Sequence, residues 1–124
     1  MIKEDYVSFE VAKLLKENGF DEPVMYHFTP DGTQRKFQQA FYKDDVAQPT
    51  LQMAMKWLRK NYRINVVIYT EISAIQEVVH YHYCIESLIP PIIGKRNEIY
   101  SDEFWYTYEE SCDSAIKYCL TNLI

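Results

Sequence analysis

The sequence has few of the features of a flexible, secreted or membrane-spanning chain. It holds only three glycines in 124 residues, and no stretch rich in glycine, serine or proline that would form a flexible linker. Its three cysteines are an odd number without a C-x-x-C motif, which argues against a disulfide framework and favours a reducing compartment. The longest apolar runs fall far short of the roughly 20 residues that cross a bilayer, and no secretory signal is visible. We therefore expect a single cytoplasmic domain with no membrane contact.

Motifs for nucleophilic catalysis and for phosphate binding are also missing. The chain contains neither G-x-S-x-G nor G-x-G-x-x-G. Gly94 and Lys95 are adjacent, but they lack the upstream glycine and the following serine or threonine of a phosphate-binding loop. These enzyme classes are excluded at the level of motifs, so we expect no cofactor and favour a non-enzymatic role.

The composition is that of an ordinary globular chain, with 48% hydrophobic and 25% charged residues. The net charge of −5 is concentrated near the C-terminus, because residues 98–124 hold six acidic side chains and Lys117 as the only basic one. The preceding residues are balanced, with twelve acids and twelve bases. An acidic chain is a poor generic binder of nucleic acid, although a local basic patch can override that tendency.

Hydrophobic periodicity and end signals predict three helices. The first runs from Phe9 to Asn18, between an N-cap at Ser8 and a left-handed C-terminal residue at Gly19. The second begins after Thr50 and the third after Thr107, where Thr107 and Glu110 form a capping box.

The remaining segments alternate as strands do. We expect them at residues 24–29, 34–42, 64–70 and 76–86, with a fifth between residues 97 and 106. Pro30, Asp31 and Gly32 predict the turn that joins the first two strands in a hairpin. The order helix, two strands, helix, two or three strands, helix indicates the α+β class, with one antiparallel sheet of four to five strands covered by three helices on one face.

Two groups of residues are candidates for a protein interaction surface. The segment from Tyr100 to Tyr108 is rich in aromatic side chains flanked by acids, although alternate rings could equally fill the core beneath the third helix. In the second helix, Met53 and Trp57 lie on neither the core stripe nor the basic flank, so they need a partner within the domain or on another molecule. The interaction candidates are Met53, Trp57, Tyr100, Trp105 and Tyr106. Self-association is the simplest form of this hypothesis.

The alternative hypothesis is nucleic-acid binding through a basic flank of the second helix. Its residues recur at helical spacing on one side, which suits contacts with phosphates: Lys56, Arg59, Lys60 and Arg63. Basic residues near a helix C-terminus also complement the helix dipole while remaining solvated, so the pattern alone does not establish binding.

Strand alternation places His80, His82 and Cys84 on one face. Two imidazoles and a thiol could hold zinc, but His27 is the only other histidine available as a further ligand. The other interpretation is that these histidines sit on the wetter face of the sheet, since Tyr81, Tyr83 and Ile85 on the opposite face are more typical of a core. We therefore assign no metal site.

Three segments together carry a resemblance to a known group of proteins. They are Val11 to Pro23, Pro49 to Arg59 with the runs Pro49-Thr50-Leu51 and Met55-Lys56-Trp57-Leu58-Arg59, and Thr107 to Leu120 with the runs Thr107-Tyr108-Glu109-Glu110 and Ala115-Ile116-Lys117-Tyr118-Cys119-Leu120. The chain resembles small uncharacterised proteins encoded in gut-bacterial genomes, prophages and other mobile elements. The resemblance covers about a third of the chain. It implies a phage or mobile-element context and gives no residue a role.

Overall fold

The computed structural model describes residues 1–36, 42–75, 77–87 and 98–124. Its helices are α1 (Phe9–Glu17), α2 (Leu51–Tyr62) and α3 (Tyr108–Asn122). Its strands are β1 (Tyr26–Phe28), β2 (Gln34–Lys36), β3 (Val46–Gln48), β4 (Ile64–Ser73), β5 (Val78–Ser87) and β6 (Glu98–Tyr100). The α+β class is confirmed. In the described parts of the chain, none of the helices is long and apolar enough to cross a membrane.

All three predicted helix starts are confirmed by their capping contacts. The hydroxyl groups of Ser8, Thr50 and Thr107 each accept a hydrogen bond from a backbone N–H in the first turn of their helix. The Thr107 hydroxyl also donates to the carboxylate of Glu110 at 2.8 Å. These contacts satisfy backbone donors that a helix leaves unpaired at its start, so each helix begins where its cap stands.

The prediction of one sheet with four to five strands is wrong, because the strands form two sheets of three. The first sheet has the order β2-β1-β3 and the second the order β4-β5-β6, and every pairing is antiparallel. No strand was predicted at β3, whose three residues are too few to show a period. Of the strand expected at residues 34–42, the structure gives Gln34–Lys36, and residues 37–41 lie outside the described parts of the chain.

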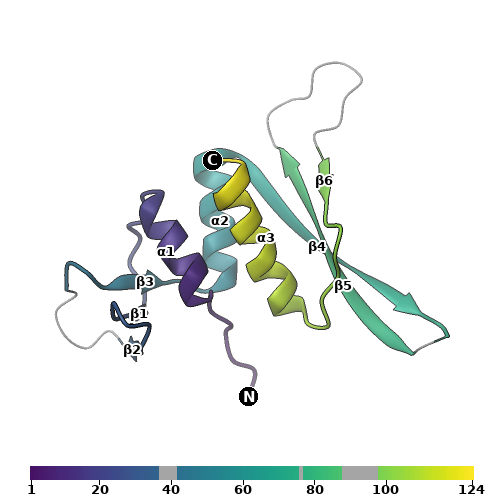
Figure 1. The fold of residues 1–124 in the computed structure, drawn as a ribbon, viewed down its shortest axis with the longest axis horizontal. Helices are drawn as coiled ribbons and strands as arrows, with labels where there is room; N and C mark the ends of the chain where they lie inside the picture. Colours follow the sequence, from purple (N-terminus) through teal and green to yellow (C-terminus); the bar gives the residue numbers. More distant parts are fainter. Residues whose placement is uncertain (37–41, 76, 88–97) are drawn as a thin grey trace.

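The three helices lie between the two sheets (Figure 1). Helix α1 packs on β3, whereas α3 packs on both β4 and β5. One continuous core of buried side chains joins these layers, with Leu15, Leu58 and Ile116 fully buried at its centre. The larger sheet is therefore covered by helices on one face, as predicted, and its other face is turned away from them.

The hairpin of β4 and β5 is longer than the helices that cover it. Its far end extends beyond α3 (Figure 1), and the side chains of Ile72 and Ile75 near the tip are 71% and 96% exposed. Near the helices, Ile85 on the same hairpin is only 2% exposed. Only the near half of this hairpin belongs to the core.

Candidate interaction surface

The register of the larger sheet assigns its side chains to two faces. His80, His82 and Cys84 of β5 share one face, as predicted, and stand opposite Glu71, Tyr69 and Val67 of β4. The alternate residues Tyr83 and Ile85 are 7% and 2% exposed. They face the helices, since the Tyr83 ring lies 6.2 Å from that of Tyr118 on α3. The first face, which we call the outer face, therefore points away from the helices.

The segment after β6 adds aromatic side chains to the outer face. Trp105 pairs with Tyr81 through two backbone hydrogen bonds of 2.8 and 2.9 Å, so an isolated antiparallel bridge holds the segment beside β5 at this point. Strand alternation then directs Trp105 toward α3 and its two neighbours outward. The Phe104 ring stacks on His80 with centroids 4.0 Å apart, and the Tyr106 ring meets His80 edge-on at 5.8 Å.

A second stack lies further along the same face. The Tyr69 ring is nearly parallel to His82 with centroids 5.1 Å apart, and the Tyr100 ring lies 6.3 Å from Tyr69. The four aromatic side chains remain open to solvent, with exposed fractions of 37% for Tyr69, 44% for Phe104, 57% for Tyr100 and 67% for Tyr106. The outer face is thus a patch of rings held in place by their contacts with one another.

The charges of the larger sheet and of the segment that follows it have one sign. The described residues between Ile64 and Thr107 include six acidic side chains and neither lysine nor arginine; Lys95 and Arg96 lie outside the described residues. The Glu71 carboxylate lies 3.1 Å from His82 Nε2. The Tyr100 hydroxyl donates to Glu98 at 2.7 Å, and this hydrogen bond, with the charge of Glu98, raises the pKa of Tyr100 to about 12. The patch is aromatic at its centre and acidic at its border.

The structure places the predicted interaction residues in four different environments. Tyr100 and Tyr106 lie together on the outer face, and Trp105 lies on the opposite side of the sheet. Trp57 is only 7% exposed, and its ring packs edge-on against Phe20 and Tyr62. Its partner is within the domain, so Trp57 is corrected from a surface candidate to a core residue.

Met53 stands apart from these aromatic residues. It lies near the start of α2 with 36% of its surface exposed. Met53 belongs to α2, whereas the outer face lies on the side of the larger sheet that points away from the helices, so Met53 is not part of that surface.

The basic flank of α2 is a separate surface. Lys56, Lys60 and Arg63 are exposed and Arg59 is half-buried. Among the ion pairs of the described residues, none involves these four side chains. Their charges are therefore available to an anionic partner.

The histidines on β5 are engaged by aromatic rings. Across the described residues, no group of three or more histidine, cysteine, aspartate or glutamate side chains is placed to hold a metal ion. Sequence reasoning identified the shared face of His80, His82 and Cys84 but missed Tyr69 as part of the surface. The sequence does show a tyrosine at position 69 in β4, but its place opposite His82 follows only from the register of the hairpin.

Known proteins do not add a functional assignment to this geometry. No protein family, curated protein or solved structure matches this chain. The function therefore has to be argued from the surfaces themselves.

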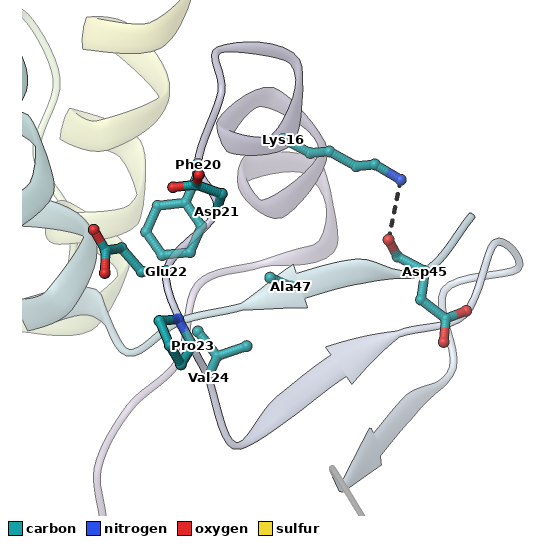
Figure 2. Close-up of a pocket in the computed structure, with 8 residues that line it drawn as sticks. All are labelled: Lys16, Phe20, Asp21, Glu22, Pro23, Val24, Asp45 and Ala47. Carbon is teal, nitrogen blue, oxygen red and sulfur yellow. Dashed lines mark hydrogen bonds between the residues drawn. The ribbon is translucent and has the colours of Figure 1, made fainter. Parts of the chain in front are cut away.

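A cavity of about 400 Å³ lies on the other side of the molecule, between the end of α1 and β3. Figure 2 shows Phe20, Pro23 and Val24 at one end and Lys16 reaching the backbone carbonyl of Asp45 at the other. The Lys16 ammonium donates to that carbonyl at 3.0 Å and to the carbonyl of Lys43 at 3.1 Å. Through these two hydrogen bonds, Lys16 connects α1 to the segment before β3.

Proposed function

We propose that this protein is a non-enzymatic interaction module that binds a protein partner through its outer face. The observation that carries the proposal is the patch of four exposed aromatic rings on the side of the sheet away from the helices. Aromatic side chains bury a large area at little cost in conformational entropy, and the stacking on His80 and His82 limits their motion before binding.

The charge of the surface indicates the kind of partner. Acidic side chains border the patch, so a partner with basic side chains gains from electrostatic complementarity. Two outer faces would instead repel each other. Self-association, the simplest version, would therefore bring the outer face of one copy against a basic surface of another, such as the flank of α2.

The cellular setting forms part of the same proposal. The resemblance of the three helical segments supports a phage or mobile-element context, and the odd number of cysteines without a C-x-x-C motif supports the cytoplasm. A small interaction module without catalytic motifs fits such a setting.

The test compares one double variant with a matched control. Phe104→Ser with Tyr106→Ser removes two exposed rings from the outer face, and Tyr42→Ser removes a 60% exposed ring elsewhere. Tagged proteins are used for capture from a lysate of the native host, with and without nuclease, and the purified proteins are compared by sedimentation. We expect a nuclease-resistant protein, or a larger assembly of the chain itself, to be retained by wild type and control. The double variant should retain at least about tenfold less of this partner or assembly. Equal retention by the double variant would remove this surface from the proposal.

The basic flank of α2 supports a second candidate function, the binding of nucleic acid. Residues 46–63 contain no acidic side chain, so nothing within this stretch offsets the basic flank. If Lys56, Arg59, Lys60 and Arg63 each contact a phosphate, the slope of log affinity against log salt should be about −3 to −4. Lys56→Ala with Lys60→Ala should reduce that slope by about 2. No retardation of DNA or RNA at low salt would exclude this candidate.

A further inference from the structure

A cleft opens on the side of the larger sheet that faces α3. It has a volume of about 400 Å³ and lies between β5, the segment 102–105 and the C-terminal part of α3. Three aromatic residues line it: the Tyr83 and Trp105 rings stack at 5.4 Å with an angle of 25° between their planes, and Tyr118 lies 6.2 Å from Tyr83. These rings present aromatic surface to whatever occupies the cleft.

Two carboxylates also line this cleft. Asp102 and Glu103 are exposed side chains beside the aromatic residues. Burial raises the pKa of Tyr83, and the nearby Tyr118, Cys119, Asp102 and Glu103 raise it further. The two carboxylates therefore add negative charge to the lining of the cleft.

Lys117 is the one basic side chain among the residues that line the cleft. Its ammonium lies 2.9 Å from a carboxylate oxygen of Glu10 on α1, so this ion pair offsets its charge. The cleft as a whole thus combines stacked rings with the carboxylates of Asp102 and Glu103, neither of which forms an ion pair within the part of the chain that the structure describes.

We propose that this cleft binds an arginine side chain of the protein partner. A planar guanidinium stacks on aromatic faces, and its five N–H donors match carboxylate oxygens in a fork geometry. Ser114, Thr121 and Asn122 line the same cleft and offer further oxygen acceptors. A quaternary ammonium would use the rings but leave these acceptors without a donor.

The proposal rests on the proposed function, because the partner supplies the arginine. The arginine proposal goes beyond the proposed function because it names a second contact site, on the opposite side of the sheet from the outer face. The segment 102–106 connects the two sites, since Phe104 and Tyr106 point outward while Trp105 points into the cleft.

The experiment titrates N-acetyl-arginine amide into the full-length protein and follows the two indole N–H signals by NMR. Trp105→Phe identifies the Trp105 signal, and buried Trp57 serves as the internal reference. We expect the Trp105 signal to shift and saturate with a Kd of about 1 mM, the range of a small ligand. N-acetyl-citrulline amide, which has nearly the same shape without the charge, should bind at least about tenfold more weakly.

Matched variants test the assigned contacts. Asp102→Asn with Glu103→Gln should weaken arginine binding at least about tenfold, whereas the equivalent change at the exposed pair Asp21 and Glu22 should leave it unchanged. Glu10→Gln frees the Lys117 charge and should weaken binding about threefold.

Three outcomes would overturn the proposal that the cleft binds arginine. They are a Trp105 signal that does not saturate, equal affinities for the arginine and citrulline amides, and unchanged arginine affinity in the variant at Asp102 and Glu103. Because the probe is a single amino acid, these results do not depend on the captured partner. Arginine binding that persists while the outer-face variant still retains its partner would overturn the proposed outer-face site alone.

Discussion

His27 and Asp45 form the most deeply buried contact between charged side-chain types in the described residues. His27 Nε2 lies 3.2 Å from Asp45 Oδ2, and the two side chains are 5% and 3% exposed. His27 belongs to β1 and Asp45 immediately precedes β3, so the contact fastens the two neighbouring strands of the smaller sheet. Burial of such groups is tolerated only when each has a partner.

Removal of this carboxylate should destabilise the whole chain. We expect Asp45→Ala to lower the free energy of unfolding by about 3 kcal/mol, because it removes a buried contact between two charged side-chain types. Asp45→Asn keeps an acceptor oxygen and should cost less. Urea unfolding measures both variants, and a loss below about 1 kcal/mol for Asp45→Ala would contradict the structural role.

At the scale of the elements, the β4 and β5 hairpin is divided into a near half and a far half. Ile85 and Ile72 lie on the face toward the helices, but only the first is covered by them. The same residue type therefore occupies a core and a solvent-exposed position on one hairpin.

This division predicts different costs for two matched substitutions. Ile85→Ala should lower the free energy of unfolding by about 3 kcal/mol, because it leaves a cavity in the core. Ile72→Ala should change it by less than about 0.5 kcal/mol, as at other exposed positions. Urea unfolding gives both values, and hydrogen exchange should show slower exchange at Val66 and Ile85 than at Ile72 and Val79. Similar costs at the two positions would show that the far half is also packed.

The start of α3 provides a second prediction for an element. Thr107→Ala removes both the acceptor for the Glu110 N–H at 3.1 Å and the donor to its carboxylate. The expected loss is about 1 kcal/mol in the free energy of unfolding. Thr107→Ser keeps the hydroxyl and should behave almost as the wild type. Equal losses in the two variants would assign the effect to the methyl group instead of the cap.

Local signals were sufficient to predict the helices, because a cap and an apolar stripe lie within the same few residues. Ser8, Thr50 and Thr107 all cap helices as expected. The division into two sheets was not predictable in this way, since it depends on β1 pairing with β3 instead of joining the larger sheet. Trp57 shows the same limit: its angle on α2 placed it off the core stripe, but Phe20 folds over it from beyond the end of α1. Of the outer face, the sequence indicated Tyr100 and Tyr106, which are close to each other along the chain. It did not indicate Tyr69, which reaches the same face only through the pairing of β4 with β5.

At the scale of the whole molecule, the buried thiols link stability to pH. Burial raises the pKa of Cys112 to about 11 and that of Cys119 to about 12. In the unfolded chain both groups lose their protons near pH 8.5 to 9. The folded state therefore retains protons that the unfolded state releases, and stability must fall as the pH rises above about 9.

The expected decline in the free energy of unfolding is about 1.5 kcal/mol per thiol between pH 8 and 10. It can be measured from urea midpoints at pH 8, 9 and 10. Cys112→Ala with Cys119→Ala should decline less over this interval, although the double variant starts from a lower stability. The raised pKa of Tyr83 adds a decline of the same sign at higher pH. A constant midpoint up to pH 10 would contradict the protonated state of these thiols.

The separation of charge along the chain also has a consequence for how the protein meets other molecules. The basic flank of α2 and the acidic larger sheet follow each other directly in sequence, and the hairpin extends away from the helices (Figure 1). Such an arrangement gives the molecule a permanent electric dipole moment, which turns it in the field of an approaching partner before any contact is made. The protein should thus arrive already oriented, and dielectric relaxation would report the dipole directly. In cells, where the Debye length is about 8 Å, this orientation acts only over the last stage of an encounter.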